Sequence, residues 1–204
     1  LVEVITDYLL QTGSLTPEEL RTFRPGICNR LDRNTSGIVT AGKSLAGLQE
    51  LSEGFRERSF GKYYRCLVKG EVRRKQLVSG YLTKDNRKNQ VMVRNVPSEG
   101  ASWIETEYWP VSVTEGYTLL EIHLITGKPH QIRAHLASEG YPVIGDYKYG
   151  NREINEAFRR KYGLTSQLLH AYRLEFPRME SALRPLSGRI IYAREPKIFQ
   201  RIQA

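Results

Sequence analysis

The sequence predicts an α+β fold with a mixed, mostly antiparallel central sheet flanked by helices. Apolar residues recur at helical spacing in some segments and alternate in others. Most alternating segments are joined by short, hairpin-like turns, which favours antiparallel pairing. The 204 residues are 40% hydrophobic and 26% charged, which is ordinary for a globular protein with a sizeable core.

The helices are predicted from apolar residues on one face and from capping residues. Thr16 and Glu19 form a capping box, with Pro17 at the first helical position. Ser44 can cap a longer helix, whose buried side is expected to carry Leu45, Leu48, Leu51 and Phe55. The predicted helices cover 1–11, a short segment before Arg24, 44–58, 130–139, 151–162 and 196–202.

The strands are predicted from alternating polar and apolar residues between turns. In the clearest one, Tyr64, Cys66 and Val68 share one face, because side chains alternate along a strand. The predicted strands cover 37–41, 60–70, two strands within 76–96 around a turn at 84–89, 102–113, 117–125, 168–176 and 189–193.

The loop around Asp32 allows two interpretations. Asp32 stands between Arg30 and Arg33 and precedes Thr35-Ser36-Gly37. It is either a salt-bridged surface turn or the carboxylate of an active site. These residues alone favour neither.

The helix after Gly127 also allows two interpretations. His130 and Arg133 are three residues apart and are expected on one face. The helix N-terminus and Lys128 favour an anion here, so Arg133 faces either a carboxylate or an RNA phosphate in a cleft. The alternative is a basic surface helix. Tyr64 is likewise either a core residue or a ring that stacks on a base.

The charge indicates a polyanionic partner. The formal net charge is +9 and the isoelectric point is near 9.6, and nucleic acid is the leading candidate. We expect no membrane partner, because no apolar run is long enough to span a bilayer and no basic leader opens the chain. The two cysteines lie far apart, which fits a reducing, cytoplasmic location.

No metal or cofactor is expected. The four histidines show no ligand spacing, and nucleotide-binding, nucleophile-elbow and zinc-protease motifs are absent from the sequence.

Several short motifs follow one another along the chain. The segment 29–37 is N-R-L-D-R-N-T-S-G, with Lys43 after it. Further motifs lie in Lys62-x-Tyr64 with Val68 and Gly70, in 127–135, in Gly140-x-Pro142, in Gly145-Asp146 with Tyr149-Gly150, and in 169–171. In this order they resemble the motifs of the RluA-type pseudouridine synthases, and the first is similar to that family's H-R-L-D-x-x-T-S-G signature.

The resemblance implies the isomerisation of uridine in RNA by a pseudouridine synthase-like fold. Asp32 would be the nucleophile, Arg133 would pair with it, and Tyr64 would stack on the target base and serve in proton transfer. Arg30 would enter the RNA stack, and Leu169 would pack beneath the base.

The expected substrate is large-subunit ribosomal RNA or transfer RNA, bound by a monomer. Lys62, Lys128 and His130 are expected to contact this RNA, whereas the choice between attack at C1′ and at C6 stays open.

The sequence departs from the family pattern in three respects. Asn29 replaces the usual histidine, which is expected to alter loop packing or RNA contact, and Lys128-Pro129 replaces a commoner Arg-Thr or Arg-Ser pair. An early strand motif and an S4-like domain are missing, and the chain opens without methionine. We therefore expect one catalytic domain over 1–204, shortened at its N-terminus.

Two other functions remain open from the sequence. A non-catalytic RNA-binding module would keep the fold without the reaction. A glycoside hydrolase would need a second carboxylate near Asp32, for which the distant Asp146 is a candidate.

Overall fold

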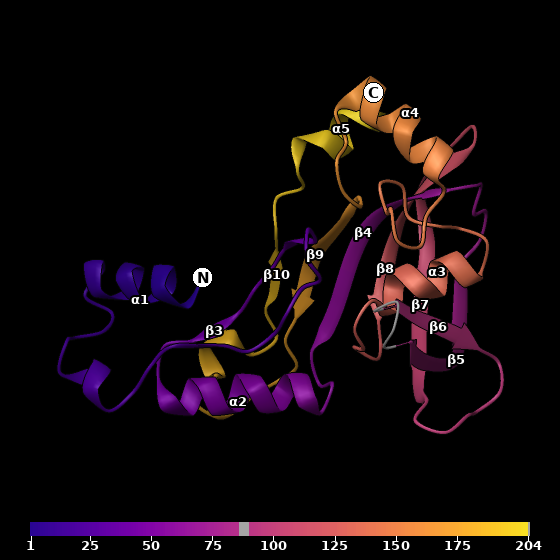
Figure 1. The fold of residues 1–204 in the computed structure, drawn as a ribbon. Helices are drawn as coiled ribbons and strands as arrows, with labels where there is room; N and C mark the ends of the chain where they lie inside the picture. The colour runs from indigo at the N-terminus through magenta and orange to yellow at the C-terminus, as the bar shows by residue number, and fades with distance from the viewer. Residues whose placement is uncertain (86–89, 204) are drawn as a thin grey trace. The chain divides into compact units, whose positions relative to one another are not determined.

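The computed structural model describes residues 1–85 and 90–203, and it consists of two compact units (Figure 1). Unit 1 comprises Leu1–Leu31, Ile38–Gly61 and Leu174–Ile191, and unit 2 comprises Asp32–Gly37, Lys62–Arg173 and Tyr192–Ala204. The predicted α+β class with a mostly antiparallel central sheet is confirmed.

Unit 1 is built around an amphipathic helix and a short two-stranded ladder. β1 pairs antiparallel with β3, and the Ser44 side chain caps α2 by accepting a hydrogen bond from the Gly47 N–H. The core beneath α2 contains Leu51, Phe60, Leu174, Phe176 and Leu183. The elements are α1 (Val2–Gln11), η1 (Glu19–Arg21), β1 (Gly26–Ile27), β3 (Ala41–Gly42), α2 (Leu45–Arg56) and η2 (Arg184–Leu186).

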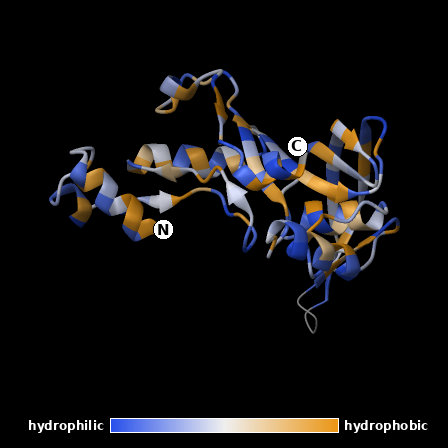
Figure 2. Ribbon diagram, turned by 90° about the horizontal axis from the view of Figure 1, so that it is seen from above, coloured by the Kyte–Doolittle hydropathy of each residue, from blue (hydrophilic) through white to orange (hydrophobic). Residues whose placement is uncertain are grey.

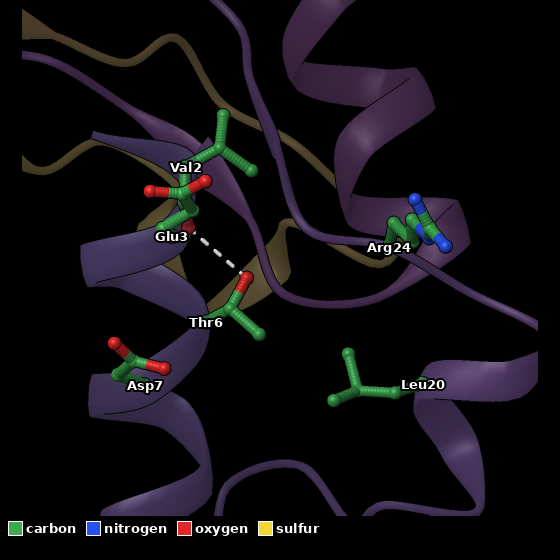
Figure 3. Close-up of a pocket in the computed structure, with 6 residues that line it drawn as sticks. All are labelled: Val2, Glu3, Thr6, Asp7, Leu20 and Arg24. Carbon is green, nitrogen blue, oxygen red and sulfur yellow. Dashed lines mark hydrogen bonds between the residues drawn. The ribbon is translucent and has the colours of Figure 1, made fainter.

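The predicted capping box forms, but the helix that it starts is a single 3₁₀ turn, η1. The Thr16 N–H donates to Glu19 Oε2 at 2.8 Å, and the Glu19 N–H donates to Thr16 Oγ1 at 3.2 Å. A pocket beside this turn is lined by Val2, Glu3, Thr6, Asp7, Leu20 and Arg24 (Figure 3). None of the predicted site residues lines it.

Two predictions in this region are wrong. The strand expected at 37–41 is two separate pairs of residues, β2 (Ser36–Gly37) and β3, because β2 pairs in parallel with β9 whereas β3 pairs with β1. Leu45 is 60% exposed instead of buried. It occupies the first position of α2, and the burial of that helix falls on Leu51 and Gly54.

The central sheet carries the alternation predicted from the sequence. Its strands follow the order β10-β9-β4-β8-β7-β5-β6, with β2 beside β9. The predicted turn at 84–89 lies, for residues 86–89, outside the described part of the chain. The strands are β4 (Gly61–Lys69), β5 (Gln76–Asp85), β6 (Gln90–Arg94), β7 (Ser102–Thr114), β8 (Tyr117–Leu124), β9 (Leu169–Glu175) and β10 (Ile190–Tyr192).

Helices supply the remaining core of unit 2, and Figure 2 shows hydrophilic and hydrophobic residues interspersed along the chain. Tyr64, Cys66 and Val68 share a cluster with Ile132 and Leu136 of α3, as their strand face and helix face predict. A second cluster joins Leu67 of β4 to the apolar faces of α4 and α5. The helices are α3 (Gln131–Ser138), α4 (Arg152–Tyr162) and α5 (Lys197–Gln203).

Within residues 1–85 and 90–203, the helices all fall short of the length and apolar character that crossing a bilayer requires.

Gly37 is required where β2 meets β9. Its φ is 118°, and a Cβ at this position would collide with the Ala171 backbone. We expect Gly37→Ala to lower the free energy of unfolding by more than about 2 kcal/mol, because strain and collision add. Gly116→Ala is the matched control, since φ is 83° there but the space is open; it should lose only about 1 kcal/mol. Equal losses in urea unfolding would contradict the assigned contact.

His135 makes the stability of the fold sensitive to pH. It is 1% exposed on α3, its Nδ1 lies 3.0 Å from Thr106 Oγ1, and burial lowers its pKa from 6.5 to about 4. Above pH 6.5 the side chain is neutral in both the folded and the unfolded chain. Below that pH the unfolded chain takes up a proton that the folded chain excludes, so stability falls as the pH falls toward 4.

The expected slope from His135 is at most about 1.4 kcal/mol for each pH unit. The pKa values of His130 and His170 are also lowered by burial, so they add in the same direction. His135→Gln should therefore flatten, but not abolish, the dependence of the unfolding free energy on pH between 6.5 and 4. Parallel curves for the two proteins in urea unfolding would show that His135 is not the source.

Candidate active site

Asp32 lies in a tight turn that several contacts hold in place. The Thr35 N–H donates to the Asp32 carbonyl at 2.9 Å, and Asn34 has a left-handed φ of 68°. The buried Gln167 donates from Nε2 to the Arg33 carbonyl at 2.7 Å. Ser36 Oγ lies 2.8 Å from His170 Nδ1, beside the parallel pairing of β2 with β9. The turn predicted around Asp32 is thus present.

Asn29 has a structural role in unit 1. Its Oδ1 accepts hydrogen bonds from the Thr40 N–H at 2.7 Å and from Thr40 Oγ1 at 3.0 Å, and its Nδ2 donates to the Ile38 carbonyl at 3.1 Å. Asn29 therefore ties residues that come before and after the Asp32 segment in the sequence.

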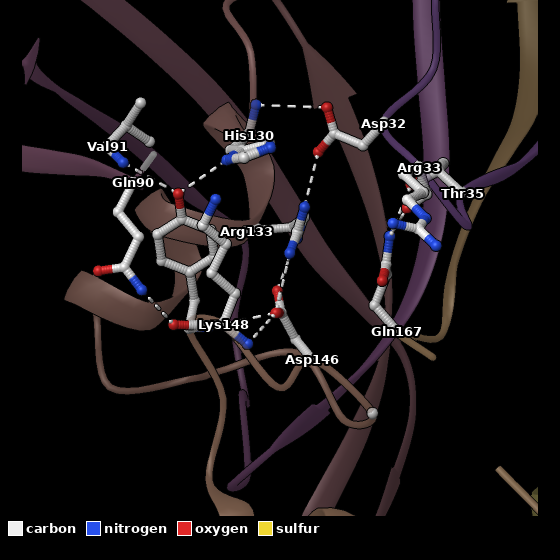
Figure 4. Close-up of polar contacts among 12 residues, drawn as sticks. Asp32, Arg33, Thr35, Gln90, Val91, His130, Arg133, Asp146, Lys148 and Gln167 are labelled. Carbon is white, nitrogen blue, oxygen red and sulfur yellow. Dashed lines mark hydrogen bonds and ion pairs between the residues drawn. The ribbon is translucent and has the colours of Figure 1, made fainter. Parts of the chain in front are cut away.

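Arg133 bridges two carboxylates (Figure 4). Its Nη1 lies 3.2 Å from Asp32 Oδ2, while Nε and Nη2 contact Asp146 Oδ2 and Oδ1 at 2.7 and 2.9 Å. The Asp146 and Arg133 side chains are only 1% and 8% exposed, whereas the Asp32 side chain is 22% exposed. The pairing of Asp32 with Arg133, expected from the resemblance, is present, and Asp32 is the end of the bridge that solvent reaches.

The start of α3 is fixed by Gln131. Its Oε1 accepts from Thr126 Oγ1 and from the Lys128 N–H, and its Nε2 donates to the Glu105 carbonyl and to Thr106 Oγ1, all within 2.8–3.0 Å. This side chain is 2% exposed and fully bonded. It therefore places Arg133, two residues later, with little freedom.

The charge of Arg133 is secured by its partners. Burial alone would lower the pKa of its guanidinium, but the bonds to Asp146 and Asp32 outweigh burial and raise it. This cation lies 3.2 Å from Asp32 Oδ2. Asp32 is thus a carboxylate in a fixed position that could act as a nucleophile.

His130 reaches Asp32 through its backbone and not through its ring. The predicted helix begins one residue late, at Gln131, because His130 takes a left-handed φ of 57° at the N-cap. Its N–H donates to Asp32 Oδ1 at 3.4 Å, and its Nδ1 lies 2.8 Å from Tyr149 Oη. His130 and Arg133 therefore donate hydrogen bonds to the two oxygens of one carboxylate.

Tyr64 is half-buried on β4, close enough to Asp32 for the charge of that residue to affect its phenol. Burial and this nearby negative charge both raise the pKa of its phenol, so the hydroxyl is protonated at neutral pH. Its ring packs against the cluster that contains Leu169, which is 4% exposed. Tyr64 is thus both a contact of the core and a neighbour of the carboxylate.

The other predicted RNA contacts are placed as follows. The Lys62 Nζ lies beside Gly127, 3.4 Å from where a Cβ of that glycine would stand. Lys128 is half-buried, and Arg30 is exposed in unit 1. Contacts of all three with RNA stay predictions.

Asp146, Tyr149 and Gln167 were not identified as site residues from the sequence. Asp146 appeared there only within a motif and as a distant second carboxylate. A signal was available in Gly145-Asp146, since an acidic residue so close to buried segments requires a partner. Across residues 1–85 and 90–203, His, Cys, Asp and Glu side chains form no group of three or more that could hold a metal ion.

The Asp146 carboxylate is expected to contribute to the free energy of unfolding. We expect Asp146→Ala to lower the free energy of unfolding by about 3–5 kcal/mol, because a buried guanidinium loses a two-bond partner. Glu53→Ala is the control, since it breaks the Arg56–Glu53 pair, whose side chains are 71% and 64% exposed; that loss should stay below about 0.5 kcal/mol. Similar small losses in urea unfolding would rule out a structural need for the bridge.

Comparisons with known proteins show the family of this chain. The family model described as RNA pseudouridylate synthase matches residues 6–138. Ribosomal large subunit pseudouridine synthase C of Pasteurella multocida is 36% identical over 180 residues, which cover 82% of this chain and 53% of that protein. The protein of the same name from Vibrio vulnificus is 36% identical over 165 residues, covering 78% and 51%. The chain thus spans about half the length of these curated relatives.

Two solved structures share the fold. Human RNA Pseudouridylate Synthase Domain Containing 4 matches 96% of this chain and 80% of its own, with a TM-score of 0.72 and 23% identity. Human RNA Pseudouridylate Synthase Domain Containing 1 matches 88% and 72%, with a TM-score of 0.67 and 22% identity. The expected fold is therefore confirmed, and so is the resemblance seen in the sequence: the chain belongs to the RNA pseudouridylate synthase family.

Proposed function

We propose that residues 1–204 form a catalytic domain that isomerises uridine to pseudouridine in RNA. The observation that carries this proposal is the partly exposed Asp32 carboxylate held by Arg133 next to Tyr64, in a chain of this family. The reaction breaks the N1–C1′ bond of uridine and joins C1′ to C5. The proton on C5 is lost and N1 gains one, so no cofactor is consumed.

Asp32 is the nucleophile of the proposed reaction. Arg133 Nη1 and the His130 N–H bind its two oxygens at 3.2 and 3.4 Å, which keeps the carboxylate oriented for attack. Attack at C1′ and attack at C6 both use this anion.

Tyr64 serves as the platform for the base. Stacking on an aromatic ring returns about 1–3 kcal/mol per base, which offsets part of the few kcal/mol spent in flipping a nucleotide out of its stack. The raised pKa of its phenol favours a neutral hydroxyl, which suits stacking and hydrogen-bond donation better than proton abstraction. Leu169 would support the base from the adjoining core.

The net charge of +9 supports binding of the RNA backbone. We assign contacts with the RNA to Arg30, Lys62, Lys128 and His130. The relatives are named for the ribosomal large subunit, so ribosomal RNA is the first candidate substrate and transfer RNA the second. A cytoplasmic location and a monomeric state belong to the same proposal, and light scattering tests the latter.

The alternatives fit the geometry less well. A hydrolase needs a second carboxylate free to act as acid or base, but Asp146 is 1% exposed and both of its oxygens bind Arg133. A purely RNA-binding module gives no physical reason for an anion held beside Tyr64.

The decisive test is Asp32→Asn, assayed by pseudouridine formation in transcripts of ribosomal and transfer RNA. We expect the rate to fall by at least about 10³-fold, with RNA affinity nearly unchanged because the fold and basic surface remain. Asp7→Asn, which changes an exposed carboxylate in unit 1, should act like the wild type.

Three outcomes would contradict the proposal. Wild-type rates from Asp32→Asn would remove Asp32 from the reaction. Release of free uracil would indicate a hydrolase. RNA binding by the wild-type chain without any isomerisation would indicate a binding module.

A further inference from the structure

Tyr149 connects its own turn, 146–149, with β6 and with the start of α3. Its ring packs with Leu82, Val91, Ile104 and Ala134, in a cluster that includes β6 and α3. Its hydroxyl lies 3.0 Å from the Val91 nitrogen of β6 and 2.8 Å from His130 Nδ1. None of the roles assigned above uses this hydroxyl.

The direction of these hydrogen bonds follows from the donor inventory. The Val91 N–H can only donate, so Tyr149 Oη accepts from it and its single O–H can point to His130 Nδ1. Nδ1 is then an acceptor, and the proton of the neutral imidazole sits on Nε2. The neutral ring is favoured because burial, outweighing the nearby charge of Asp32, lowers the pKa of His130.

The backbone of His130 is in a conformation that needs support. A left-handed φ of 57° costs a non-glycine residue about 1 kcal/mol or more and persists where the surroundings impose it. This conformation directs the His130 N–H to Asp32 Oδ1 at 3.4 Å. The bond between the His130 ring and Tyr149 restrains the same residue from its other end.

The turn 146–149 contacts both Arg133 and His130, the residues that donate hydrogen bonds to Asp32. Asp146 binds Arg133 through two bonds, and its Oδ1 also accepts from the N–H groups of Lys148 and Tyr149 at 2.9 and 3.2 Å. Gln90 Nε2 donates to the Lys148 carbonyl at 3.1 Å and ties the turn to β6 (Figure 4). One short turn thus restrains Arg133 through Asp146 and His130 through Tyr149.

We propose that Tyr149 is a positioning residue, whose hydroxyl holds His130 so that the His130 N–H stays on Asp32 Oδ1. The inference deepens the proposed function and rests on it. Tyr149 acts through His130 and has no contact with the RNA. Because the His130 N–H binds the carboxylate proposed as the nucleophile, loss of the Tyr149 hydroxyl should lower kcat more than it changes KM.

Tyr149→Phe tests this role, because it keeps the ring and removes only the hydroxyl. We expect kcat to fall about tenfold or more, since small displacements of a reacting group are costly, with smaller changes in KM and in the Kd for RNA. Tyr147→Phe is the matched control on the same loop. Its hydroxyl donates to Glu156 Oε1 at 3.2 Å on the exposed surface, so wild-type kinetics are expected.

A second variant separates the proposed path from a general loss of folding. His130→Gly accepts the left-handed conformation without strain and removes the ring that Tyr149 holds. Adding Tyr149→Phe to His130→Gly should cause no further loss of kcat, because both changes interrupt one path. Independent, multiplying losses would overturn the proposal, as would a wild-type kcat in Tyr149→Phe, or a rise in KM larger than the fall in kcat.

A spectroscopic measurement tests the contact without any activity. In the wild-type chain, ¹⁵N NMR should show His130 protonated on Nε2 with Nδ1 as acceptor, and the His130 amide should be protected from hydrogen exchange. Tyr149→Phe should mix the tautomers and speed the exchange, and unchanged signals would overturn the proposal. A wild-type chain that makes no pseudouridine but shows these signals would refute the proposed function and leave the contact intact.

Discussion

The site depends on one buried guanidinium shared between two carboxylates. A buried cation is stable only when its donors are bonded, and Asp146 takes Nε and Nη2 of Arg133 and leaves Nη1 for Asp32. The less exposed carboxylate therefore fixes the orientation of Arg133, and the more exposed one is left to face a substrate. Asp146 and Asp32 therefore have different roles although both bind Arg133: Asp146 is buried and structural, and Asp32 is accessible to a substrate.

The position of Arg133 is also fixed by the first turn of α3. Gln131 fixes the turn to β7 through the Glu105 carbonyl and Thr106 Oγ1, and Arg133 follows two residues later. His130, just before the helix, contributes a backbone N–H that a regular helical residue would direct elsewhere. The left-handed conformation of His130 thus allows His130 and Arg133, three residues apart, to bind the same carboxylate.

The family model and the structure describe different parts of the site. The family model covers residues 6–138, which include Asp32, Tyr64 and Arg133, but it ends before Asp146 and Tyr149. The contacts of those two residues come from the structure alone. The sequence places both residues in a motif, and the structure shows what that motif contacts.

The sequence by itself determined the elements whose signals are local. The cap at Ser44 and the alternation of Tyr64, Cys66 and Val68 predicted a helix and a strand face correctly, and the motifs indicated the pairing of Asp32 with Arg133. Only the tertiary structure decided the exposure of Leu45, the division of 37–41 and the left-handed His130. It also decided the roles of Asp146 and Tyr149. Each of these depends on contacts between segments distant in the chain, and local periodicity carries no record of such contacts.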